Sequence, residues 1–356
     1  MSRWPGLLIG VLLLPNTSAS TAELRSKVFR DWIAGCDNLN QCVALSFPGE
    51  DASPGIAYLK LERIGGALAA PTLTLNLREA KLKESFPTEL TLDDAPFPTA
   101  GHMFKGFSMD GEVGEVGLPE AEIAALLAAA RKATKLAVRF EGKSFAVSLA
   151  GAVAAMIWID EQQGRLGTVD ALIRKGDAPA TRVQPARTLP VITARATAKL
   201  PKPDAKTVQA ITGAVRDQVK AGGATDCDNS GPVREPDRIW PLDANRRLVA
   251  LHCGTGAYNS ATGYWIVTGN SGANAKPVTF PGEKSNILVN AEYDPDKGQL
   301  SYYGKGRGVG DCGSAANYAW TGSAFVLTSL TRMEVCRGLP PDDWLSLFHS
   351  EVKVAK

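Results

Sequence analysis

Six cysteines are the residues in this chain whose type and spacing most clearly predict a chemistry. They occur as three successive pairs: Cys36 and Cys42, Cys227 and Cys253, Cys312 and Cys336. An even number of cysteines in an exported chain is typical of structural disulfides. Many pairings are possible for six cysteines. We expect sequential pairing, because it keeps each bridge inside one part of the chain.

A metal or redox role for these cysteines is not supported by their spacing. Zinc and dithiol sites favour C-x-x-C pairs or nearby histidines, and the sequence contains no C-x-x-C motif. His252 is the only histidine beside a cysteine, Cys253. Neighbouring residues of a strand point to opposite faces, so these two could not easily share a metal. We therefore predict no metal and no cofactor.

A glycine-rich block at residues 304–313 is the second candidate for chemistry. A phosphate loop would need Lys-Ser or Lys-Thr followed by a helix, whereas Asp311 and Cys312 stand here and the flanks resemble strands. We interpret the block as a turn whose glycines allow positive φ. Lys305, Arg307 and Asp311 would then form a charged rim for binding.

Tyrosine and tryptophan residues are concentrated in the last third of the chain. They are Tyr258, Tyr264, Tyr293, Tyr302, Tyr303 and Tyr318, together with Trp240, Trp265, Trp320 and Trp344. In the pairs Tyr264–Trp265 and Tyr302–Tyr303 we expect one buried and one outward ring, since successive side chains alternate across a strand. Outward rings would suit a partner protein or a sugar, although β-propensity alone also favours aromatic residues in strands.

Three histidines, His102, His252 and His349, are the remaining candidates for catalysis. Neither a G-x-S-x-G nucleophile motif nor a His-Glu-x-x-His zinc motif accompanies them. A hydrolase would need a pocket that gathers one of them with a carboxylate and a hydroxyl. We keep an envelope hydrolase as the alternative function and expect a non-catalytic protein.

The start of the chain has the layout of a cleavable secretory signal. Arg3 precedes the apolar run at residues 7–14, and small residues follow up to Ala22. The run is shorter than the ~20 apolar residues that span a bilayer. We predict a signal peptide at residues 1–22 and a periplasmic location. The small net charge of +2, without long runs of one sign, argues against nucleic acid as a partner.

The first half, residues 23–176, is predicted to be a β-rich domain with helices at its edge. Period-two alternation indicates strands at residues 57–64 and 72–77, one near residue 91, and a hairpin at residues 136–149. Helices are expected from Pro119, over residues 152–163 and over residues 168–175.

Prolines then mark a boundary. Residues 177–204 contain five of them, and we expect an extended linker there without a packed strand. The second half, residues 205–356, is predicted to begin with a helix at 205–221 and to continue as strands. The clearest of these strands are at residues 246–253, 263–268, 289–293, 299–305 and 325–335.

Several blocks of the sequence resemble a family of exported bacterial proteins, the domain-of-unknown-function family 1176. They are FRDWIAGCDNLNQCVAL at residues 29–45, the segment from Trp158 to Gly167, KGRGVGDCG at residues 305–313, and Cys-Arg-Gly at residues 336–338. The first half is also similar in layout to the invasion-associated locus B proteins. That resemblance implies a periplasmic β-sandwich-like domain and assigns no catalytic residue.

The sequence therefore predicts a mainly β protein, with a sandwich-like first domain and a disulfide-linked antiparallel second domain. We expect a non-catalytic binding module that contacts an envelope protein or a glycan. The candidate contact residues are Tyr302, Tyr303, Lys305, Arg307 and Asp311.

Overall fold

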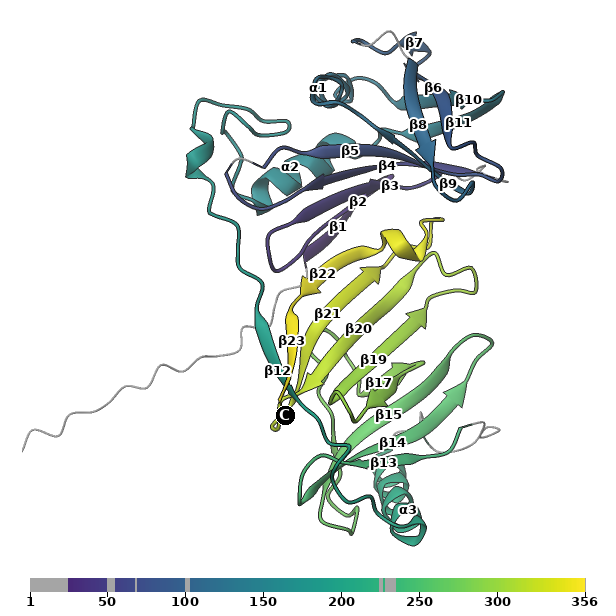
Figure 1. Cartoon of the computed structure of the whole chain (residues 1–356), viewed down its shortest axis with the longest axis vertical. Helices are drawn as coiled ribbons and strands as arrows, with labels where there is room; N and C mark the ends of the chain where they lie inside the picture. Colours follow the sequence, from purple (N-terminus) through teal and green to yellow (C-terminus); the bar gives the residue numbers. More distant parts are fainter. Residues whose placement is uncertain are drawn as a thin grey trace, which may run out of the picture.

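The structure is a computed structural model that describes residues 25–49, 55–67, 69–99, 103–223, 227 and 235–355. The predicted signal segment, residues 1–22, and His102 lie outside the described residues. Within the described ranges the fold is mainly β, as predicted, with three α-helices and almost entirely antiparallel sheets (Figure 1). No helix in these ranges is long and apolar enough to cross a membrane.

One 11-stranded antiparallel sheet forms the first half. Its strands are β1 (Arg25–Phe29), β2 (Trp32–Cys36), β3 (Cys42–Ser46), β4 (Ile56–Arg63), β5 (Thr72–Arg78), β6 (Ser85–Leu92), β7 (Ala95–Pro96), β8 (Met103–Ser108), β9 (Val113–Gly117), β10 (Lys135–Phe140) and β11 (Lys143–Ser148). In space the order is β1-β2-β3-β4-β5-β9-β8-β6-β10-β11, with β7 beside β6. The hairpin predicted at residues 136–149 is β10–β11.

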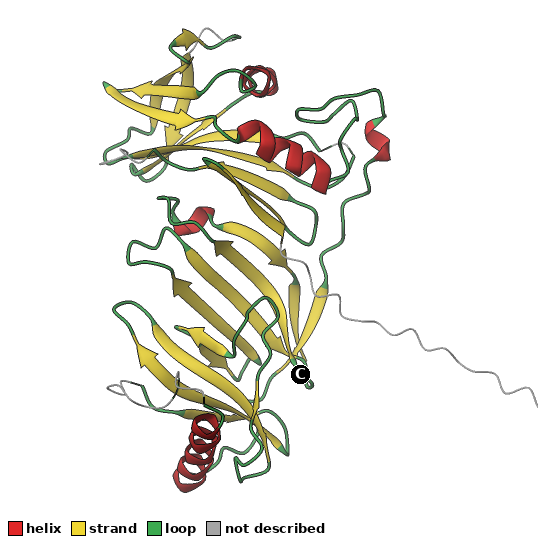
Figure 2. Ribbon diagram, turned by 180° about the vertical axis from the view of Figure 1, so that it is seen from behind, coloured by secondary structure: helices red, strands yellow, loops and turns green. Residues whose placement is uncertain are grey.

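Two helices cover this sheet, α1 (Glu120–Ala129) and α2 (Ala152–Gln162). Figure 2 shows α2 lying along the first strands, and α2 buries Met156 and Ile159 against them. Strand β2 is buried at all five positions, because α2 covers one face and the second half of the chain covers the other. Burial on both faces explains why β2 has no polar alternation.

The second half contains two five-stranded antiparallel sheets. The first has β13 (Arg238–Pro241), β14 (Arg246–Thr255), β15 (Ser260–Thr268), β16 (Lys276–Pro277) and β17 (Ile287–Val289); the second has β18 (Glu292–Asp294), β19 (Gln299–Lys305), β20 (Gly313–Trp320), β21 (Phe325–Met333) and β22 (Leu345–His349). Helix α3 (Ala205–Ala221) begins where predicted, with Asp204 accepting a hydrogen bond from the Thr207 N–H as its N-cap. Short 3-10 helices occur at Ala180–Arg182 and Pro341–Asp343.

The predicted alternation of the aromatic pairs is half right. Tyr302 is buried and Tyr303 is half-buried, where it stacks on Trp344. Tyr264 and Trp265, however, are both buried. Tyr264 faces the core between the two sheets, and Trp265 faces a second cluster that α3 completes. The prediction of an outward ring is wrong there because the sequence does not show that α3 covers that face.

Three further predictions about local structure are wrong. Residues 168–175 form turns instead of a helix. The strand predicted at residues 289–293 is split into β17 and β18 at Asn290, whose φ is positive. The proline-rich segment contains strand β12 (Val191–Arg195), which pairs in parallel with β23 (Glu351–Ala355). The N–H of Glu351 also bonds to the Pro190 carbonyl, so prolines flank this strand without interrupting it.

The two halves share one apolar core. Ile33, Leu45 and Phe47 of the first half belong to the same buried cluster as Leu345 and Leu347 of β22. A Cβ added at Gly35 of β2 would lie 2.8 Å from Leu345 Cδ1, so the strands are in close contact. The division into domains at residues 23–176 and 205–356 remains a prediction, because this core belongs to both of them.

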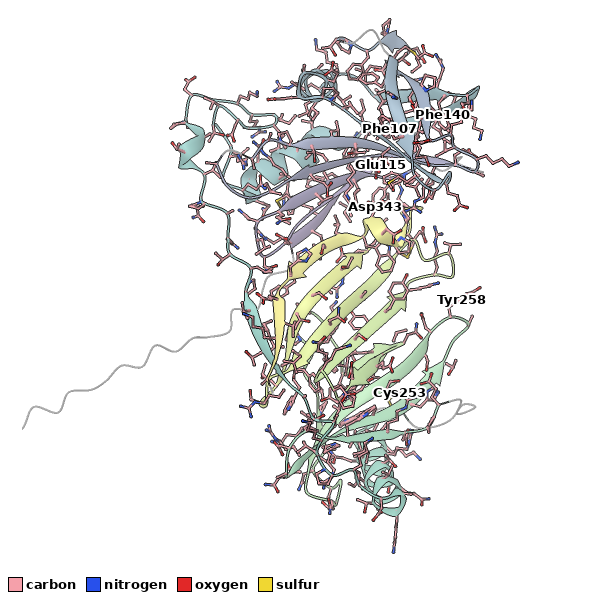
Figure 3. The ribbon with its side chains drawn as sticks, viewed as in Figure 1. Phe107, Glu115, Phe140, Cys253, Tyr258 and Asp343 are labelled. Carbon is pink, nitrogen blue, oxygen red and sulfur yellow. A yellow bond between two sulfur atoms is a disulfide. The ribbon has the colours of Figure 1, made fainter. Side chains whose placement is uncertain are left out.

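Polar contacts complete the junction. The side-chain amide of Asn38 donates to the His349 carbonyl at 2.9 Å, and the His349 N–H donates to Asn38 Oδ1 at 2.8 Å. The hydroxyl of Tyr58 donates to Asp343, which also lies 3.3 Å from Lys60 Nζ. Figure 3 shows Asp343 between the two halves. We conclude that the halves are held in one fixed arrangement.

Candidate functional site

Two loops at one edge of the second half lie against each other and form an exposed surface. We call it the tip surface and define it by Tyr258, Lys305, Arg307 and Val309. Tyr258 lies in the β14–β15 turn and is 66% exposed, and Val309 lies in the β19–β20 loop and is 77% exposed. Figure 3 shows Tyr258 at the edge of the molecule, away from the core. The second loop is the glycine-rich turn predicted from the sequence.

Close contacts hold the two loops together. A Cβ at Gly308 would lie 2.6 Å from the Tyr258 ring, so the ring would have to move away if any other residue replaced this glycine. The Asn259 side chain donates to the Lys305 carbonyl at 2.9 Å and accepts from the Lys305 N–H at 3.4 Å. Asn290 donates to the carbonyls of both Tyr258 and Tyr303. The exposed side chains therefore stand on a preorganised base.

Asp311 braces the tip surface from inside. It was predicted at the charged rim, but it is only 5% exposed, so that part of the prediction is wrong. Its carboxylate accepts from Arg307 Nε at 2.6 Å and from the Gly338 N–H at 2.7 Å. The hydrogen bond from Arg307 lowers the pKa of Asp311, against the effect of burial. Tyr302 is also buried and is held by Glu283 and Ser314.

Asp311→Asn is expected to lower the free energy of unfolding by about 1.5 kcal/mol at neutral pH, at the low end for a charged hydrogen bond because Arg307 is half exposed. A lowered pKa in the folded state gives stability that is present above the ordinary pKa and lost as pH falls. The difference between wild type and variant should therefore shrink below the ordinary pKa of 3.8. Urea unfolding at several pH values measures this, and a constant difference would contradict it.

All three disulfides follow the predicted sequential pairing. They join Cys36 to Cys42, Cys227 to Cys253 and Cys312 to Cys336, and no described cysteine is free. Asp311, Cys312 and Cys336 lie close enough together to suggest a metal site. The two sulfurs are bonded to each other, however, and a disulfide offers no thiolate ligand. The bridge instead anchors the glycine-rich loop to the segment that follows β21.

The histidines inside the described ranges do not form a catalytic relay. His349 Nε2 lies 2.9 Å from Ser346 Oγ and 3.6 Å from Asp37 Oδ2. A serine hydrolase needs the hydroxyl and the carboxylate on different ring nitrogens, whereas both approach the same one here. His252 is buried and contacts the Thr255 hydroxyl through Nε2 at 3.2 Å. These contacts give no support to the hydrolase alternative.

A groove of about 890 Å³ in the first half was not predicted from the sequence. Helix α1 forms one wall, and residue 67 together with residues 69–71 and 169–175 forms the other. Two charged residues, Arg63 and Asp170, line this groove. They belong to no recognisable motif in the sequence, so the sequence did not indicate a site there.

A buried network of charges supports this groove. Arg63, Asp160 and Arg165 have almost fully buried side chains, and Asp170 is partly buried. Arg63 lies 3.5 Å from Asp160 and 3.0 Å from Asp170, which also pairs with Arg165. Burial lowers the pKa of Arg63 to about 10 and raises the pKa of Asp160. The network contains two cations and two anions, so it carries no net charge.

Asp160 also fixes the loop at residues 165–176. Its carboxylate accepts from the N–H groups of Leu172 at 2.8 Å and Ile173 at 3.3 Å. Gln163 contributes as well, since its Nε2 donates to the Arg63 carbonyl and its Oε1 accepts from Arg165. These bonds give the loop its shape and exclude the helix predicted at residues 168–175.

The family described as "Protein of unknown function (DUF1176)" matches residues 26–351. The chain belongs to this family. The match spans both halves, and two of the four blocks that carry the DUF1176 resemblance lie at the two features described above. The segment Trp158–Gly167 supplies Asp160, Gln163 and Arg165 to the buried network, and KGRGVGDCG forms the glycine-rich loop of the tip surface.

Two known proteins resemble this DUF1176 chain. The uncharacterized protein YpfG of Escherichia coli (strain K12) is 27% identical over 354 residues, which cover 96% of this chain and 97% of that protein. The crystal structure of invasion associated protein b from Bartonella henselae covers 39% of this chain and 99% of that chain, with 14% identity and a TM-score of 0.29.

Proposed function

We propose that this protein is a non-catalytic binding module of the periplasm, and that the tip surface contacts an envelope protein. The signal-like layout of residues 1–22 and the three disulfides support an exported, oxidising location. The shared core of the two halves supports a rigid carrier of this surface.

One observation carries the proposal: exposed side chains stand on a base that is already fixed. Tyrosine and arginine are the residue types that contribute most to protein interfaces. Tyr258 and Arg307 provide them here, with Val309 as an exposed apolar neighbour. Because the loops are bonded to each other, binding would cost little ordering entropy. Val309 favours a protein over a glycan. Lys305 favours an acidic partner surface, because it forms no ion pair among the described residues, whereas Arg307 is already paired with Asp311.

Photo-crosslinking in living cells tests the proposal. p-Benzoylphenylalanine replaces Tyr258 or Val309 in two variants and Met109, which is fully exposed in the first half, in a control. We expect adducts of higher mass from positions 258 and 309 and none from 109. Sensitivity of the adducts to protease would identify a protein, and sensitivity to glycosidase a glycan. Adducts from 109 alone, or from no position, would contradict the proposal.

A further inference from the structure

The groove in the first half follows one face of α1 from end to end. The residues of this stripe are Glu120, Ile123, Ala124, Leu127, Ala128 and Arg131. The ten residues of α1, at 1.5 Å each, make this wall about 15 Å long. An extended chain advances about 3.3 Å per residue, so about five residues would fill this length.

The two ends of the groove carry opposite charges. Glu120 lies at the start of α1, whereas Arg131 lies just beyond its end, where its guanidinium donates to the Ile173 carbonyl. Arg174 and Lys175 therefore lie at the same end as Arg131. Among the described residues, none of these four side chains forms an ion pair. The free charges are thus one anion at one end and three cations at the other.

Between the charged ends the walls are small and apolar. Ala124 and Ala128 are exposed on α1, and the facing segments include Ala69, Pro71 and Ala171. No tyrosine or tryptophan lines the groove in the described part of the chain, so it has no ring on which a sugar could stack. Small side chains instead allow a backbone to approach closely. The facing loop is fixed by the buried Asp160, so the walls are already formed.

We propose that this groove binds an extended peptide segment of a partner protein, about five residues long, with small apolar residues between a basic end and an acidic end. The basic end would lie at Glu120 and the acidic end at Arg131, Arg174 and Lys175. Opposite charges at the two ends distinguish this occupant from an acyl chain, which carries one anionic head and would leave Glu120 without a partner. The site is separate from the tip surface, so either proposal can fail alone.

Selection from a random hexapeptide library, displayed on phage, tests this inference on the full mature chain. We expect enriched sequences with Lys or Arg near one end and Asp or Glu near the other. The best synthetic peptide, measured by fluorescence polarisation, should bind Ala128→Trp at least tenfold more weakly, because the indole would fill the groove. Ala124→Trp is a second filling variant, and thermal melting shows whether each variant is folded.

A charge exchange gives the sharper control. In Glu120→Lys/Arg174→Glu/Lys175→Glu both ends of the groove change sign, because two new anions outweigh Arg131 at the formerly basic end. None of the three replaced side chains holds the fold through an ion pair. This variant should bind the selected peptide at least tenfold more weakly and should prefer the same peptide with its terminal charges exchanged. Absence of enrichment, equal binding to the filled groove, or displacement of the peptide by laurate with no effect of the charge exchange would each overturn the proposal.

Discussion

Asp160→Ala is expected to lower the free energy of unfolding by about 3–5 kcal/mol, the cost of leaving a buried charge without its partner. Asp160 is fully buried, and its removal leaves Arg63 and Arg165 with Asp170 as the one remaining anion of the network. The N–H groups of Leu172 and Ile173 would also lose their acceptor. Each unsatisfied buried donor adds a penalty of about 1–3 kcal/mol before the structure relaxes.

Urea unfolding measures this loss, and hydrogen exchange of residues 165–176 locates it. The control is Lys353→Ala, because the pair Lys353–Glu351 has a similar separation of 3.4 Å but exposed side chains. The control should change stability by only about 0.2–1 kcal/mol. Equal effects of the two substitutions would show that the buried network does not support the groove. Unchanged exchange of the loop would show that Asp160 does not hold it.

The sequence correctly predicts the strands and helices that are covered on one face only, because their apolar residues then recur with the period of the strand or helix. Strand β5 and helix α1 show clear alternation or helical spacing, and both lie where expected. The stretch at residues 168–175 has helix-compatible residues, but Asp160 takes the N–H groups that a helix would use. The deciding partner is eight or more residues away on another element, so local pattern could not show it.

Contacts between segments that are distant in the sequence explain the other differences between the predicted and the observed structure. Trp265 has an ordinary strand environment in the sequence, and only the position of α3 makes its face buried. Strand β12 forms because β23, more than a hundred residues later, supplies its pairing edge. A pairing between distant segments produces no periodic pattern within either segment, so the sequence could not predict it.

The candidate site was predicted in part. Residue spacing identified the glycine-rich loop, and Lys305 and Arg307 lie on its surface. Tyr258 was noted only as one of several late tyrosines, since its contact with Gly308 joins residues fifty apart. Asp311 and Tyr302 have side chains suited to binding, but both point inward and brace the loops. Composition suggests which residue types bind, whereas exposure depends on the fold.

Tyr258→Ala/Val309→Ser tests the proposed contact with the largest expected effect on binding. Loss of an anchoring tyrosine typically costs an interface about 2 kcal/mol or more, or about 30-fold in affinity. Both side chains are mainly exposed, so the melting temperature should hardly change, as for ordinary surface substitutions. A matched control is Met103→Ser/Met109→Ser, which removes two exposed apolar side chains from the first half.

The partner that photo-crosslinking identifies is then captured from a periplasmic extract without crosslinking. The amount captured is compared for the wild type and the two double variants. The protein is used at a concentration no higher than the wild-type dissociation constant, so that a 30-fold weakening removes at least nine-tenths of the captured partner. We predict that the wild type and the methionine variant retain the partner, and that Tyr258→Ala/Val309→Ser loses at least nine-tenths of it at an unchanged melting temperature. Full capture by Tyr258→Ala/Val309→Ser, or its loss in the methionine variant alone, would contradict a contact at the tip surface.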